Sequence, residues 1–183
     1  ITSVNDVTAG YWNPAGLLGI DNIHQVALMH SEYFGGIAKY DYGAYATRLD
    51  SASVLGVSMI RFGVDDIPNT TELVDANGNV DYNRISTFSA ADYAFIVSYA
   101  KKVKIPKLRL GASAKIIRRK VGDFAGAWGF GLDAGAQYEC KKWKFAAMAR
   151  DVTSTFNAWS FNLSDKMQET FIATGNKIPE NSV

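Results

Sequence analysis

Hydrophobic and polar residues alternate with a period of two along much of this 183-residue chain. The clearest stretch runs from Ala127 to Asp151. In its first half one face collects Phe130, Leu132, Ala134, Ala136 and Tyr138. The opposite face receives mainly glycines, and the alternation restarts after a polar turn at 140–142. Alternation on both sides of a short turn predicts two antiparallel strands joined as a hairpin.

The same alternation recurs upstream of this hairpin. It predicts further strands at about 24–33, 39–48, 53–62, 92–101 and 108–120. Ile116 and Ile117 interrupt the last of these and predict a bulge there. The expected connections differ in length: short polar turns at 49–53, 102–107 and 139–143, a long loop at 63–91, and a tail after 153 without a strand pattern.

These features together predict an all-β fold of the transmembrane antiparallel β-barrel type. Each arm of the hairpin has about ten residues, which is the length a tilted strand needs to cross a bilayer. Aromatic residues stand near strand ends, and short turns on one rim oppose long loops on the other. About seven strands are expected, and an unclosed sheet in lipid would leave unpaired backbone groups. We therefore expect further strands after Val183. The alternative to a membrane barrel is a soluble β-barrel or sandwich.

Two segments depart from the period of two. Residues 1–20 contain Asn13 followed by Pro14, which predicts an N-cap and the first position of a short helical turn. Ser164 to Gly175 predicts a short amphipathic helix, capped at Ser164, with Met167 and Phe171 on its apolar stripe.

Composition narrows the range of functions. The chain has 19 Lys and Arg against 18 Asp and Glu, so it lacks the excess of positive charge that is typical of nucleic-acid binding. No apolar run is long enough for a transmembrane helix. Cys140 is the single cysteine, so no intramolecular disulfide can form. His24 and His30 lack the carboxylate or cysteine neighbours of a metal site, and Cys140 lacks a histidine partner. We expect no enzymatic activity, no metal and no cofactor.

Two sets of residues are candidates for function. By parity, five charged residues face the inside of the barrel: Arg109, Lys115, Asp133, Lys144 and Arg150. They indicate a salt-bridged lumen or a polar conduit, whereas a transporter of apolar molecules would need an apolar path. Six apolar residues lie in the expected long loops and are predicted to bind a partner: Ile67, Leu73, Trp159, Phe161, Met167 and Phe171. The alternative is that these loops pack on one another and close the barrel mouth.

Three further segments are distinctive: 5–17 (NDVTAGYWNPAGL), 62–70 (FGVDDIPNT) and 149–153 (ARDVT). They resemble segments of outer-membrane proteins of the PorV/PorQ type, which are relatives of the FadL fatty-acid transporters. The resemblance implies a barrel of about 14 strands, of which 21–152 would form the first half. It also implies that residues 1–20 plug the lumen around Asn13, Pro14 and Ala15, and that 153–183 form an extracellular loop.

The resemblance also implies a function. PorV-like proteins reside in the outer membrane, bind the large translocon barrel of type IX secretion and handle its cargo proteins. We therefore expect a non-enzymatic component of a type IX secretion or gliding machinery. The alternatives are a FadL-like transporter of hydrophobic molecules and an accessory barrel of another large outer-membrane complex.

Overall fold

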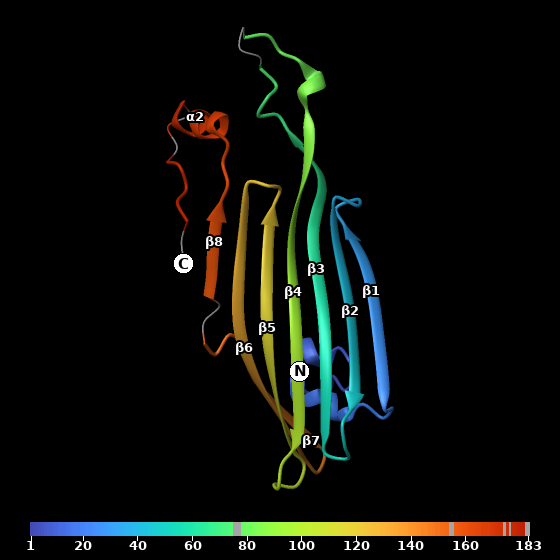
Figure 1. The fold of residues 1–183 in the computed structure, drawn as a ribbon. Helices are drawn as coiled ribbons and strands as arrows, with labels where there is room; N and C mark the ends of the chain where they lie inside the picture. Colours follow the sequence, from blue (N-terminus) through green and yellow to red (C-terminus); the bar gives the residue numbers. More distant parts are fainter. Residues whose placement is uncertain (75–77, 154–155, 174, 176, 182–183) are drawn as a thin grey trace.

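The protein is a single curved antiparallel sheet with short helices at its ends and on one face (Figure 1). The computed structural model describes residues 1–74, 78–153, 156–173, 175 and 177–181. The strands are β1 (His24–Tyr33), β2 (Ala38–Arg48), β3 (Ser53–Asn69), β4 (Ser86–Lys102), β5 (Leu108–Val121), β6 (Ala125–Cys140), β7 (Trp143–Ala149) and β8 (Phe156–Phe161). The helices are α1 (Ala9–Trp12), η1 (Pro14–Gly19), η2 (Tyr82–Arg84) and α2 (Asp165–Ala173).

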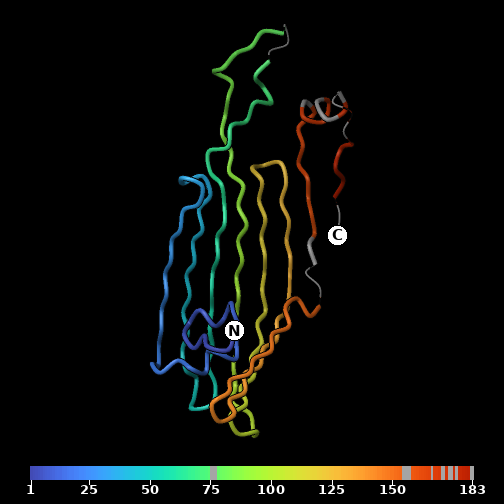
Figure 2. Tube along the Cα trace, turned by 180° about the vertical axis from the view of Figure 1, so that it is seen from behind, coloured from blue at the N-terminus to red at the C-terminus, as the bar shows by residue number. Residues whose placement is uncertain are grey.

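Each strand from β1 to β7 pairs with the next one along the chain, so the sheet is an up-and-down meander. It curls into the shape of a half-barrel, and residues 1–20 lie against its concave face (Figure 2). This confirms the prediction of an all-β antiparallel fold. The expected helical turn after Asn13 is also present, because Pro14–Gly19 form a 3-10 helix that Asn13 caps.

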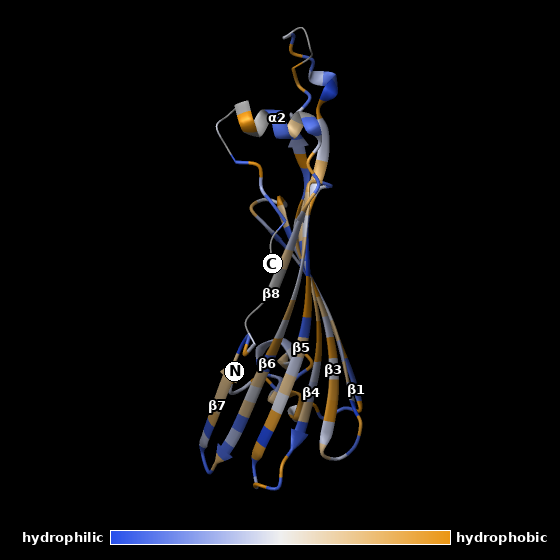
Figure 3. Cartoon of the chain, turned by 60° about the vertical axis from the view of Figure 1, so that its left-hand side comes forward, coloured by the Kyte–Doolittle hydropathy of each residue, from blue (hydrophilic) through white to orange (hydrophobic). Residues whose placement is uncertain are grey.

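The period of two places apolar side chains on the convex face of the sheet. Successive cross-strand partners on this face are Val26, Tyr45, Val57, Val97, Ala114 and Leu132. The concave face carries small and polar residues, such as the buried Ser98, Ser113 and Gln137. Hydrophobic and hydrophilic positions alternate visibly along the strands in Figure 3. The covered side also contains apolar residues, since Val54, Ile60 and Ile96 belong to the buried cluster around Leu17. The exposed side is therefore mainly apolar, and the covered side mixes small, polar and apolar residues.

Two strands are longer than the alternation predicted. β3 continues to Asn69 and β4 begins at Ser86, so the expected loop 63–91 shortens to 70–85. The ladder between them shifts register between Val64 and Ile67, where Asp66 has a positive φ of 57°. This bulge breaks the alternation, which is why the pattern failed to reveal the continuation. The bulge predicted at Ile116 and Ile117 is absent, because both ladders of β5 run through these residues without a shift.

The segment after residue 153 also differs from the prediction. β7 pairs with 134–140 of β6, and β8 pairs with 125–130 of the same strand. The two short strands therefore occupy one strand position, and their ladders with β6 leave out its residues 131–133. Trp159 and Phe161, predicted to lie in an extracellular loop, belong to this strand. The sequence has six residues between the two ladders, 150–155, whereas β6 has only three, 131–133. These extra residues break the alternation, so the pattern did not reveal β8.

The helix predicted at 164–175 is present as α2, with the Ser164 hydroxyl accepting from the amide of Met167 at 3.4 Å.

The turn between β2 and β3 is held by Asp50, which accepts hydrogen bonds from the Ser53 hydroxyl and the Ala52 amide, both at 2.6 Å. These two bonds, the one from Ser53 foremost, hold the pKa of Asp50 below its ordinary value.

The assignment of β8 predicts a specific disulfide. Ala127 and Trp159 are directly opposite in the antiparallel ladder, at a spacing that a disulfide can bridge. In a Cys140→Ser background, Ala127→Cys with Trp159→Cys should cross-link under mild oxidation, as read by mass spectrometry. Ala127→Cys with Ser160→Cys is the matched control, because adjacent strand residues point to opposite faces. Equal cross-linking of both pairs would mean that 156–161 form a flexible loop.

Candidate functional site

The concave face of the sheet is the best-defined site of the molecule, and residues 1–20 occupy it. Asn13, Ala15 and Leu17 each have 0% of their surface exposed. The Asn13 side-chain oxygen accepts from the amide of Ala15 at 3.1 Å. Its amide nitrogen donates to the carbonyl oxygens of Ala136 on β6 and Ala147 on β7, both at 3.3 Å. Asn13 therefore caps η1 and ties it to two strands.

Two facing glycines allow this close approach. Gly111 on β5 and Gly135 on β6 are cross-strand partners. A β-carbon at Gly111 would lie 2.4 Å from the amide nitrogen of Ala15 and 2.5 Å from the carbonyl carbon of Pro14. A β-carbon at Gly135 would lie 2.1 Å from the side-chain oxygen of Asn13. The sheet is thinned at the point where the Asn13-Pro14-Ala15 backbone rests on it.

Polar side chains of several strands bind the backbone of this segment. Ser98 and Ser113 both donate to the carbonyl oxygen of Gly10, at 3.3 and 3.4 Å. Gln137 donates to the carbonyl oxygen of Ile1 at 2.9 Å, and Gln25 accepts from the amide of Val7 at 2.8 Å. Since these groups satisfy buried backbone atoms, the polar inner face of the sheet is matched to the segment that covers it.

The five predicted inner charges lie on the concave side or at its border, in separate contacts. Lys115 bridges Asp133 at 3.0 Å and Asp151 at 2.8 Å. Arg109 pairs with Glu139 at 3.2 Å, and both line a hollow of about 250 Å³ with Lys144.

Arg150 contacts the N-terminal segment directly. It donates to the carbonyl oxygen of Tyr11 at 3.0 Å, and its guanidinium carbon lies 4.8 Å from the centre of the Tyr11 ring. The charges therefore brace the covering segment and one another.

Asp151 is a participant that the sequence pattern did not reveal. It lies in the interruption between β7 and β8, with a positive φ of 52°, and its amide donates to Asp133 at 2.9 Å. A β-carbon at Gly131 would lie 2.6 Å from an Asp151 carboxylate oxygen. The interruption thus folds toward the concave side, where Arg150 and Asp151 reach different partners. The adjacent glycine at 131 is the only signal in the sequence.

The convex face carries a broad exposed apolar surface. Leu28 is 82% exposed, Val97 51% and Phe130 54%. A cross-strand row of polar residues ends this surface toward the β3–β4 loop: His30, Asp41, Arg61, Tyr93, Arg118 and Trp128. We call it the boundary row. The next row on the apolar side consists of Leu28, Gly43, Met59, Phe95, Ile116 and Phe130.

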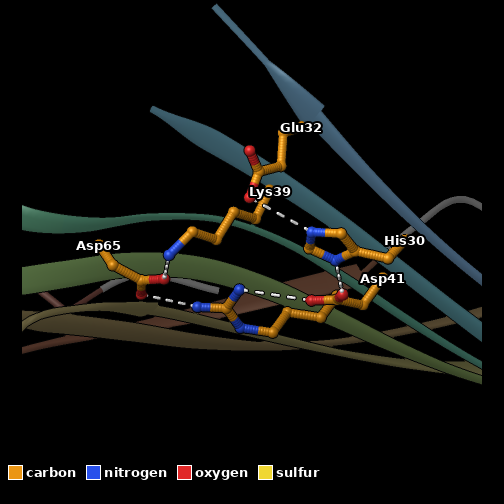
Figure 4. Close-up of polar contacts among 6 residues, drawn as sticks. His30, Glu32, Lys39, Asp41 and Asp65 are labelled. Atoms are coloured by element: carbon orange, nitrogen blue, oxygen red, sulfur yellow. Dashed lines mark hydrogen bonds and ion pairs between the residues drawn. The ribbon is translucent and has the colours of Figure 1, made fainter. Parts of the chain in front are cut away.

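The β1–β3 part of the boundary row forms a chain of alternating charges (Figure 4). His30 lies 2.6 Å from Asp41 and 3.5 Å from Glu32. Arg61 lies 3.6 Å from Asp41 and 2.7 Å from Asp65. Asp65 in turn lies 3.4 Å from Lys39. His30 therefore hydrogen-bonds two carboxylates, and these contacts are ion pairs when its imidazole is protonated.

The six predicted partner-binding residues lie in β3, in the turn after it, in β8 and in α2. Ile67 lies in β3 opposite Phe88, and Leu73 is half-buried in the following turn. Trp159 and Phe161 stack at 6.0 Å between ring centres in β8. Met167 is half-buried in α2, and the side chain of Phe171 lies outside the described residues. The exposed apolar residues at this end of the molecule include Phe34, Ile37, Val80, Tyr82 and Ile172.

Within the described ranges, no cluster of three metal-ligating side chains occurs, and no helix is long and apolar enough to cross a membrane. Residues 75–77, which belong to the Asp- and Asn-rich stretch 75–81 (DANGNVD), lie outside those ranges. Scans against models of known protein families and against curated protein sequences found no match.

The approach at Gly111 predicts a large effect from a single methyl group. Gly111→Ala should destabilise the protein by about 1–3 kcal/mol, because the backbone of Pro14 and Ala15 must move away. Gly43→Ala is the matched control, since a β-carbon there meets only Leu28, at an ordinary 3.5 Å. Urea unfolding in detergent and proteolysis of residues 1–20 provide the measurements. If both variants behave alike, the segment is not held against β5.

Proposed function

We propose that this chain forms part of an outer-membrane β-barrel, with its convex face in lipid. The observation that carries the proposal is the broad exposed apolar surface on the convex face of the sheet. Soluble proteins rarely expose a contiguous apolar surface of several strands, whereas every barrel strand in a bilayer alternates apolar-out and polar-in.

The height of the apolar surface supports this proposal. On β6 the convex side chains run from Trp128 to Tyr138. At about 3.3 Å per residue these ten steps cover about 33 Å along the strand. A strand tilted by about 45° rises about 23 Å over that length, close to the apolar band of about 25 Å in outer-membrane barrels. Trp128 and Tyr138 would then lie at the two interfaces, where aromatic residues concentrate.

The open edges of the sheet support a larger barrel. In the described residues, β1 pairs only with β2, and β7 and β8 pair only with β6. A strand edge in lipid would leave unpaired backbone groups, so further strands must close the sheet. A barrel of about 14 strands, with residues 1–20 inside it as a plug, satisfies this requirement.

For the role of the barrel we propose a non-enzymatic component or cargo-handling partner of a type IX secretion or gliding machinery. The resemblance to PorV-like proteins motivates this choice. The charged residues of the inner face support it over a FadL-like transporter, because Lys115, Asp133 and Arg150 are unsuited to a path for apolar molecules. An accessory role in another large outer-membrane complex is the second candidate. The exposed apolar residues of the loop between β3 and β4, which we call the β3–β4 tip, support both roles equally.

The membrane proposal predicts that a charge on the convex face is costly. Val97→Lys should destabilise the lipid-inserted protein by about 2–4 kcal/mol, since Val97 is in the middle of the apolar surface. Tyr82→Lys, at an exposed position in η2 beyond that surface, should change little. Folding into phosphatidylcholine vesicles, followed by urea titration, measures both. A harmless Val97→Lys would contradict a lipid-facing sheet.

The partner proposal predicts a binding surface at the β3–β4 tip. Val80 and Tyr82 are 54% and 74% exposed there, and large exposed side chains of this kind supply much interface energy. Affinity purification from native membranes should recover a large outer-membrane barrel with the wild type. Recovery should fall several-fold with Val80→Ser and Tyr82→Ser combined.

The matched control is Leu49→Ser, which removes a residue that is 56% exposed at the opposite rim. Unchanged recovery with the Val80 and Tyr82 substitutions would show that the tip is not the docking surface.

A further inference from the structure

The convex face has a basic hollow directly beyond its apolar surface. It encloses about 230 Å³, and its polar lining includes Arg118, Lys120, Asp123, Ser160 and Asn162. Gly126 forms part of its floor, and Arg118 lies flat against it, because a β-carbon at Gly126 would be 2.7 Å from the guanidinium. The hollow therefore combines a guanidinium, an ammonium, a hydroxyl and an amide, with one carboxylate.

The two cations of this hollow differ from the neighbouring Arg61. Arg61 is neutralised by Asp41 and Asp65 in the alternating chain of charges. Arg118 instead donates to the carbonyl oxygen of Ala127 at 3.3 Å and stacks over Trp128 at 5.0 Å. Across the part of the chain that the structure describes, no carboxylate forms an ion pair with Arg118. Its charge is therefore available to a ligand.

Lys120 is paired only loosely. Its ammonium lies 3.4 Å from Asp123, whose side chain is 93% exposed and can turn away into solvent. Exposed pairs of this kind contribute little energy, so a stronger anion can replace Asp123 at small cost. The backbone N–H of Asn162 donates to the carbonyl oxygen of Phe124 at 2.7 Å, which fixes the backbone at this position. The hollow thus offers several donors to one anionic group.

The surroundings specify what carries the anion. Below the hollow, toward the apolar surface, lie Trp128, Phe130 and Ile116, which are 50%, 54% and 41% exposed. A ligand that fills both regions has an anionic head joined to apolar chains. We propose that Arg118 and Lys120 bind the phosphate of an anionic lipid headgroup, with its acyl chains on the apolar surface. This inference rests on the proposed membrane location of the convex face.

The chemistry of phosphate fits this geometry. A guanidinium and an ammonium both form charge-assisted hydrogen bonds with phosphate oxygens, and a hydroxyl and an amide can complete the set. A basic side chain near an anionic lipid surface contributes roughly five-fold in affinity. Two such side chains give a preference of about 25-fold for an anionic phosphate lipid over a zwitterionic one.

Quenching of tryptophan fluorescence by brominated lipids tests the proposal. The protein has four tryptophans, so Trp12, Trp143 and Trp159 are changed to Phe in every protein compared, the wild type of the test included. Trp128, which adjoins the hollow, is then the single fluorescent tryptophan. The protein is reconstituted into phosphatidylcholine vesicles that contain phosphatidic acid, with bromine on the chains of one lipid or the other. The wild type should prefer phosphatidic acid by about 25-fold. Arg118→Gln combined with Lys120→Gln should abolish the preference, and Lys120→Gln alone should reduce it about five-fold.

Lys101→Gln combined with Lys102→Gln is the matched control, because it removes two charges at the other end of the sheet and should leave the preference unchanged. Quenching by brominated phosphatidylcholine reports whether each variant is folded in the bilayer. Absence of that quenching in the wild type would overturn the membrane location. Its presence without any preference for phosphatidic acid would overturn only the headgroup site.

Two further results would also contradict the headgroup site. One is an undiminished preference in the variant that lacks both charges. The other is displacement of phosphatidic acid by inorganic phosphate at equal concentration, which would show that the hollow binds a free anion. Resistance to inorganic phosphate supports the lipid assignment, since the acyl chains then contribute to binding.

Discussion

The structure depends on the packing of the Asn13-Pro14-Ala15 backbone against Gly111 and Gly135. This contact brings a polypeptide segment close enough for Ser98, Ser113 and Gln137 to bind its carbonyl groups. These polar side chains can then remain on the concave face, because they bind the segment that covers it. The same segment buries the apolar residues of that face, since Leu17 and Leu18 cluster with Val54, Ile60 and Ile96. The convex face has no such cover and leaves its apolar residues exposed.

The interruption between β7 and β8 connects this inner contact to the wall of the sheet. Arg150 reaches the covering segment at Tyr11, while Asp151 joins Lys115 and Asp133. Lys115 and Asp133 are mostly buried, so removal of one partner would leave a costly unpaired charge. The interruption costs three ladder positions and gains a junction between strand and segment. In our proposal this junction fixes the plug to the barrel, while the convex face of the same wall lies in lipid.

The period of two was sufficient to predict the all-β fold and most of its strands, and the cap and apolar stripe after Ser164 predicted α2. It failed where side chains leave the ladder. The bulge near Asp66 concealed the ends of β3 and β4, and the interruption at 150–155 concealed β8. Trp159 and Phe161 were consequently predicted in a loop. The contacts of Asp151 and the basic hollow around Arg118 depend on cross-strand register, which alternation within one strand does not specify.

Site-directed spin labelling along β4 tests the central claim, that the convex face is in lipid, most directly. Single labels at 93 to 99 in vesicles would be compared for collision with oxygen, which concentrates in lipid, and with a polar nickel complex, which remains in water. The account predicts oxygen accessibility at 93, 95, 97 and 99 alone, with a period of two. Equal accessibility of these positions to the nickel complex would show that the convex face is in water and would contradict the account.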